Sequence, residues 1–295
     1  MGNISMQHMQ RSARTAFLVL LVALLAGCGM ARMAYNKGEG LSYFWLDRYV
    51  DFTDEQRPWV KAEIDEIFAW HRRTELPGYI ELLQKAQQRV HGPVTEAEVK
   101  ADAATVRKHV LLIIDRSTPG LADIALSMHS EQIAHLEKKF ASNNEDYRKD
   151  NLRGDIAKRQ RDRYKKALKQ AEYFFGNFSA AQEQRLRELS DARPLNNELV
   201  LRERMRRQQA ILVMLRRIQA EKPSREAAIQ MVREYVKAAT EHFGNADHKA
   251  YYQAYEAATI RQVTEIINGT TAEQKAHFTH TLQHWINDFR RLSER

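Results

Sequence analysis

Apolar side chains recur at helical spacing along nearly the whole chain after residue 40. One such stripe contains Val99, Ala103, Val106, Val110 and Ile113. This spacing places the apolar side chains on one face of a helix, and that face has to pack against other helices. Glycine and proline occur only 12 and 6 times, and no stretch shows the alternation typical of a half-buried strand. The sequence therefore predicts an all-α protein, an irregular multi-helix bundle of about nine or ten amphipathic helices.

Capping residues predict where several of these helices begin. Thr53, Ser179 and Thr271 each precede a Gln by three residues, and Thr95 precedes Glu98 in the same way. This is the capping-box pattern, in which each side chain bonds to the backbone N–H of the other residue. The three Thr/Ser-x-x-Gln boxes are either a weak internal repeat or ordinary caps, and ordinary capping is the preferred interpretation.

Three other segments are expected to interrupt the helices. Pro77 should start or kink a further segment, and Pro119-Gly120 should break the chain, because proline lacks the backbone N–H that a helix interior needs. Residues 143–154 are polar and are expected to form a loop with a helical turn. This loop is a candidate subdomain boundary within a helical domain of residues 41–295.

A basic and then apolar segment lies near the N-terminus. Two arginines precede eleven apolar residues, 16–26, and the run ends in Leu-Ala-Gly-Cys28. The run is shorter than the roughly 20 residues of a membrane-spanning helix and is typical of a secretory signal. Its end resembles the bacterial lipobox, which implies cleavage before Cys28. We expect a lipoprotein signal peptide at 1–27 and a lipidated tether at 28–40; the alternative is an uncleaved apolar helix with a chance cysteine.

Cys28 is the only cysteine of the chain. The lipobox resemblance implies that its thiol carries diacylglycerol and its new amine a further acyl chain such as palmitate. Several acyl chains hold a protein on a membrane almost irreversibly. We therefore expect membrane lipid as a partner and a location in the cell envelope, facing the periplasm. Gly29 stands where an Asp would resemble an inner-membrane retention signal, which favours the outer membrane.

Two segments rich in arginine and lysine fall on predicted helices. Either could bind an anionic envelope polymer or an acidic unfolded client, whereas we expect no nucleic-acid partner for a secreted lipoprotein. The alternatives are solvated helix faces paired with neighbouring acids, and arginines buried between helices as hydrogen-bond donors. The candidate residues are Arg153, Lys158, Arg159, Arg163, Lys166, Arg202, Arg206 and Arg207.

A second candidate is a polar group before Pro77, formed by His71, Arg72, Arg73 and Glu75. We interpret it as a structural network or, alternatively, as a polar site.

Motifs that carry chemistry are missing from the sequence. It contains no Gly-rich phosphate loop, no Gly-x-Ser-x-Gly elbow and no His-Glu-x-x-His motif. We therefore predict no catalytic residues, no metal site and no cofactor, although three histidines share one face of the last predicted helix: His277, His280 and His284.

The chain resembles a family of proteobacterial helical lipoproteins that is described only as a domain of unknown function. The resemblance covers nearly the whole mature chain and includes the lipobox ending at Cys28. The other matching segments are Ala34-Tyr35-Asn36, Trp45 to Asp51, Trp70 to Pro77, Asp191-Ala192-Arg193-Pro194 and Arg206-Arg207-Gln208-Gln209. The family implies no established activity. The Thr/Ser-x-x-Gln boxes are also similar to the Leu-Thr-x-x-Gln helix starts of periplasmic stress chaperones, although Phe52, Phe178 and Thr270 replace the Leu.

These features together predict a lipid-anchored, non-catalytic envelope protein that faces the periplasm and binds a partner. The partner is another envelope protein, an unfolded client or an anionic envelope polymer. The alternatives are a chaperone-like holdase, a structural envelope component, and an envelope hydrolase whose site the sequence does not reveal.

Overall fold

A computed structural model describes Tyr35 and residues 37–294. The predicted signal peptide and Cys28 lie outside the described residues. Within the described part the chain forms ten α-helices, one 3₁₀-helix and no strand, which confirms the all-α prediction. The elements are α4 (Gly38–Val50), α5 (Gln56–Arg89), α6 (Glu96–Ser127), α7 (Ser130–Asn151), α8 (Ile156–Phe175), α9 (Ala180–Ala192), α10 (Asn197–Glu221), α11 (Arg225–Thr240), η3 (His242–Gly244), α12 (Ala246–Asn268) and α13 (Ala272–Ser293).

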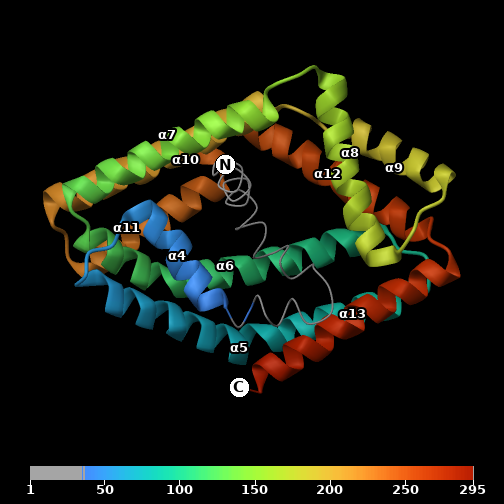
Figure 1. Ribbon diagram of the computed structural model, residues 1–295, viewed down its shortest axis with the longest axis horizontal. Coiled ribbons are helices and arrows are strands. Elements are labelled where there is room, and N and C mark those ends of the chain that lie inside the picture. Colours follow the sequence, from blue (N-terminus) through green and yellow to red (C-terminus); the bar gives the residue numbers. More distant parts are fainter. Residues whose placement is uncertain (1–34, 36, 295) are drawn as a thin grey trace, which may run out of the picture.

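Figure 1 shows these helices arranged as an elongated frame. Helices α7 and α10 pack together along one side, and α5 and α13 pack together along the opposite side. At one end α8 packs on α9, and α9 packs on α12. Helix α6 runs through the middle of the frame and contacts α5, α11 and α12. The bundle is therefore irregular, because neighbouring helices cross at many different angles.

Two groups of buried apolar side chains stabilise the frame. The larger group joins α4, α5, α6, α7, α10 and α11, and includes Phe52, Val60 and Ile218, each 1% exposed. The smaller group joins α5 to α13 through Leu76 and Phe289. Burial of one such side chain contributes about 1.5–3 kcal/mol. Because α5 belongs to both groups, this long helix connects the two halves of the frame.

The expected break at Pro119-Gly120 is wrong, and so is the start of a further segment at Pro77, whereas a kink at Pro77 stays a prediction. Pro77 lies inside α5 and Pro119 inside α6, and both helices continue past them. Beside Pro119, the hydroxyl of Thr118 donates to the carbonyl of Ile114 at 2.8 Å, a side-chain bond of the kind that often bends a helix without ending it. A Cβ on Gly120 would lie 2.7 Å from Glu63, so this glycine permits a close approach of α5 and α6. The true break follows α6 at residues 128–129.

The predicted loop at 143–154 is also wrong for most of its length, because α7 continues to Asn151. The polar residues that suggested a loop bond to α10 instead. The Asn144 amide donates to Gln208 at 2.7 Å, and Arg204 donates to the Asn144 oxygen at 3.0 Å. Tertiary hydrogen bonds therefore stabilise a helical stretch with few apolar residues. The subdomain boundary near these residues stays a prediction.

Two of the predicted capping boxes bond to each other. The Gln182 amide donates to the Gln274 oxygen at 2.7 Å, and the Gln274 amide donates to the Gln182 oxygen at 3.2 Å. Each amide also donates to a backbone carbonyl just before the other helix: Gln182 donates to the Gly269 carbonyl and Gln274 to the Asn177 carbonyl. The first turns of α9 and α13 are therefore tied together.

The same arrangement occurs at the starts of α5 and α7. The Gln132 amide donates to Gln56 at 2.8 Å and to the Asp51 carbonyl at 3.0 Å. The Gln56 amide donates in return to the Ser127 carbonyl at 2.9 Å. The box of α7 was not predicted because His129 takes the place of Thr or Ser, although the backbone N–H of His129 donates to Gln132 in the usual way.

Both pairs follow one rule, since each Gln donates to the carbonyl five residues before its partner Gln. The boxes are therefore caps, as expected. The four boxes that contain Gln also form two copies of the same contact between helix starts.

We expect Gln274→Ala to lower the free energy of unfolding by about 2 kcal/mol, because it leaves several buried polar groups without a partner. Glu98→Ala, in the exposed Thr95 box, which bonds to no other capping box, should cost clearly less. Urea unfolding followed by circular dichroism measures both changes. Equal losses would contradict a role for the contact between boxes.

Candidate functional site: the exposed middle of helix α6

The middle of α6 is exposed over most of its circumference. All of residues 103–108 are exposed, and Val106 is 37% exposed. One turn further, Leu111 and Leu112 are 39% and 41% exposed. Neighbouring exposed apolar side chains make this span a candidate binding surface.

Both ends of α6 are held by neighbouring helices. At its start, Glu96 pairs with Arg261 of α12 at 3.5 Å. Near its end, Asp123 pairs with Arg225 of α11 at 2.7 Å. The exposed middle is therefore a rigid helical span that is also joined to α5 through His109, and it needs no folding when a partner binds.

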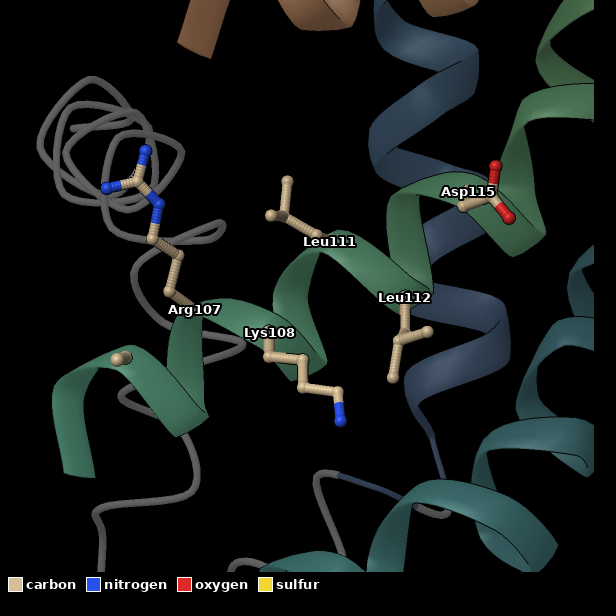
Figure 2. A pocket seen from close by; sticks show the side chains of 6 residues that line it. Arg107, Lys108, Leu111, Leu112 and Asp115 are labelled. Carbon is tan, nitrogen blue, oxygen red and sulfur yellow. The ribbon is translucent and has the colours of Figure 1, made fainter. Parts of the chain in front are cut away.

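Figure 2 shows how the side chains of this span are arranged. Arg107 and Leu111 lie on one side of α6, and Lys108 and Leu112 lie on the other, as the spacing of four residues requires. Together with Ala104 and Asp115 they line an open depression of about 450 Å³. Each side of the span therefore offers one cation and one leucine.

Charge is unevenly distributed along the depression. Asp115 closes one end and pairs with Arg233 of α11 at 3.6 Å. Arg107 and Lys108 are exposed at the other end. The accessible charge of the depression is therefore positive, and it suits a ligand that carries carboxylates beside apolar groups.

The polar group predicted around His71 is a packed network inside the frame. Tyr35 Oη lies 2.8 Å from His71 Nδ1, and Tyr79 Oη lies 3.3 Å from His71 Nε2. Burial of the ring, helped by the charges of Arg72 and His109, lowers the pKa of His71 to about 4. Burial also raises the pKa of both tyrosines. A neutral imidazole accepts from one hydroxyl and donates to the other.

The remaining members of the predicted group have different surroundings. Glu75 is buried and its Oε2 lies 2.7 Å from His109 Nδ1 on α6. Arg72 pairs with Glu39 of α4 at 2.8 Å, whereas Arg73 is exposed. The contacts of His71 and Glu75 are those of a structural network, and a polar site stays the alternative prediction. Tyr35 and His109 were not predicted as partners because they lie outside α5.

The predicted basic residues of α8 are largely engaged in contacts. Arg159 pairs with Glu198 at the start of α10 at 2.9 Å. Arg163 donates to the Pro194 carbonyl at 2.9 Å. Lys158 pairs with an acid one turn along its own helix at 2.7 Å. These contacts correspond to the alternatives of paired faces and interhelical arginines.

Other basic residues remain candidates for anion binding. Arg153, Lys166 and Arg202 are exposed, and Arg206 is partly buried. Arg207 pairs with Glu203 at 3.1 Å. Anion binding by the exposed members stays a prediction.

One buried cluster was not predicted. The carboxylate of Glu203, 2% exposed, lies 2.6 Å from His248 Nδ1 and 3.1 Å from His242 Nδ1. Burial alone would raise the pKa of Glu203, but hydrogen bonds from the two histidines and the charge of Arg207 outweigh it and leave this pKa below its usual value. His242 and Phe243 adopt positive φ angles of 52° and 50°. The only sequence signal was the pair of histidines around Gly244.

The three histidines of α13 do not converge. His280 Nε2 and His284 Nε2 lie 3.0 Å apart, but His277 faces the Tyr173 carbonyl of α8 at 3.4 Å. In the described part of the chain, no three His, Cys, Asp or Glu side chains are placed to hold a metal ion together.

Comparisons with known proteins identify a family but no activity. A family model described as "Family of unknown function (DUF6279)" matches residues 48–234, more than half of the chain. No curated protein and no solved structure matches. None of the helices between residues 37 and 294 combines the length and the apolar character that crossing a bilayer requires.

Proposed function

We propose that this chain, which belongs to the family of unknown function DUF6279, is a lipid-anchored envelope protein that faces the periplasm and binds a protein partner without catalysing a reaction. Acylation of Cys28, residence in a proteobacterial envelope and the preference for the outer membrane are parts of this proposal. They rest on the lipobox and on Gly29.

The exposed middle of α6 is the observation that supports partner binding. Leu111 and Leu112 lie on opposite sides of the helix, and both line the same open depression beside two cations. Arg107 and Lys108 favour a partner with carboxylates. We assign as partner an amphipathic helix or extended segment of another protein, with acidic and apolar residues on adjacent faces.

Binding of an acidic amphipathic peptide to the acylated chain in vesicles tests this assignment. A labelled peptide with leucines on one face and glutamates on the other should bind, and Leu112→Asp should weaken it at least tenfold, about 1.4 kcal/mol. Val213→Asp on α10, where the valine is 55% exposed, is the matched control and should leave the affinity unchanged. Fluorescence anisotropy measures the dissociation constants.

Polyglutamate separates the two kinds of anionic partner. It carries the charge without apolar side chains, so it should compete with the peptide only weakly. Equal competition would favour an anionic envelope polymer instead.

In the peptide-binding experiment, equal weakening by the Leu112 and Val213 substitutions would overturn the assignment to α6.

A holdase is the second candidate, because exposed leucines on a rigid span can bind many unfolded clients. The acylated chain at stoichiometric amounts would then suppress the aggregation of an unfolded acidic protein, and Leu112→Asp would remove this protection. Binding of the peptide without any protection would exclude the holdase.

A further inference from the structure

The outer face of α4 carries a stripe of two cations and two apolar side chains. Lys37, Leu41, Phe44 and Arg48 follow at spacings of four, three and four residues, which places them on one side of the helix. Leu41 is 55% exposed and Phe44 is 58% exposed. The Arg48 guanidinium lies 5.8 Å from the centroid of the Phe44 ring. Apolar residues flanked by cations are typical of helices that lie in a bilayer interface.

The opposite face attaches α4 firmly to the frame. The Tyr43 ring stacks with Phe52 at 6.0 Å between centroids, and the Tyr49 ring lies 6.2 Å from Phe140 of α7. The Asn143 amide of α7 donates to the Tyr49 hydroxyl at 2.8 Å. Helix α4 therefore presents its stripe in a fixed direction relative to the other helices.

Tyr35 and Gly38 fix the position of the chain just before this stripe. Tyr35 bonds to His71, and its ring lies 5.5 Å from Phe68 of α5. A Cβ on Gly38 would lie 2.7 Å from the Phe68 ring, so the start of α4 is packed closely against α5. The chain therefore enters the frame at a defined point beside the stripe.

The short distance along the chain from Cys28 to Tyr35 limits the orientation of an anchored frame. These seven residues span at most about 25 Å when fully extended. Helix α5 has 34 residues and is about 50 Å long. An anchor at Cys28 therefore keeps the start of α4 close to the bilayer, because the tether is only about half as long as α5.

We propose that the face of α4 formed by Lys37, Leu41, Phe44 and Arg48 lies on the bilayer surface. Leu41 and Phe44 enter the region of the upper acyl chains, and the two cations lie beside the phosphates of anionic lipids. This inference rests on the proposed acylation of Cys28 and adds a defined orientation to it. It also assigns a role to Phe44, which the packing of the frame does not use.

A single thiol at the stripe tests the contact in the acylated full-length chain. Cys28 is the only native cysteine and its acylated sulfur does not react, so Leu41→Cys or Phe44→Cys provides the only free thiol for a fluorescent label. The chain is reconstituted in vesicles of phosphatidylethanolamine and phosphatidylglycerol with and without brominated acyl chains. Ile156→Cys on α8, where the isoleucine is 67% exposed, is the matched control.

Bromolipids should quench the label at 41 or 44 at least threefold more than the label at 156. Lys37→Glu with Arg48→Glu should reduce this difference by at least half, while circular dichroism stays that of the parent chain. If the chain floats with the vesicles but the label is quenched equally at all three positions, the proposed contact of α4 is overturned and the anchor is not. If the native chain reacts with the thiol label and does not float with the vesicles, Cys28 is not acylated. This result overturns the anchor, and with it this inference.

Discussion

Glu203→Gln is expected to lower the free energy of unfolding by about 3 kcal/mol at pH 7. The ionised carboxylate accepts hydrogen bonds from His242, His248 and Arg207 and is almost fully buried. A glutamine offers only one acceptor oxygen and turns an N–H₂ group toward a donor. At least one of the three donors is then left without a partner in the interior. Urea unfolding followed by circular dichroism measures the loss.

Glu221→Gln on the same helix is the matched control for this prediction. Glu221 is 53% exposed and pairs with Arg217 one turn away, and such surface pairs contribute little. A loss at position 203 no larger than the loss at 221 would contradict the importance of the buried cluster.

The pKa of Glu203 also predicts a pH dependence of stability. Because this pKa is below the ordinary value in the folded state, its stabilisation is present above the unfolded pKa of about 4.3. It is lost as the pH falls through the folded value. The Gln variant should therefore show a shallower loss of stability in acid than the parent chain.

His71 is expected to make the fold less stable between pH 6.5 and pH 4. Its folded pKa of about 4 lies below the value of about 6.5 for an unfolded histidine. In this window the unfolded chain binds a proton that the folded chain does not, so stability falls as the pH falls. The full difference amounts to about 3 kcal/mol. Above pH 6.5 this contribution is constant.

His71→Gln should remove this slope, although the substitution itself lowers stability at neutral pH. His91→Gln is the control, because His91 is exposed and solvated in both states. Unfolding free energies at pH 7, 6, 5 and 4 for the three chains decide the outcome. A slope that persists in His71→Gln would show that the proton binds elsewhere.

Helix starts were predictable because the capping contacts are local. The Thr95 hydroxyl accepts from the backbone of Glu98, and the Asp155 carboxylate accepts from that of Lys158. Each contact joins residues three apart, so it can be read directly from the residue types. The same reason explains why the pairing between Gln182 and Gln274 was missed, since these residues are 92 positions apart.

The site on α6 was predictable only in part. The stripe containing Val106 and Val110 was read as a buried face because apolar residues at helical spacing usually pack inward. In the structure Val106 is exposed and Val110 is only partly buried. Of the predicted polar group, His71 and Glu75 are bonded to Tyr35 and His109, and these partners depend on how separate helices meet.

The sequence by itself determined the helical class, most helix starts and the proposal of an anchor at Cys28. These features depend on residue type, on period and on contacts a few positions apart. Only the tertiary structure decided that α5 and α6 continue through their prolines, that the capping glutamines pair, and that Glu203 meets two histidines. The physical reason is that packing and buried hydrogen bonds join residues dozens of positions apart, and their free energies outweigh local preferences of about 1–3 kcal/mol.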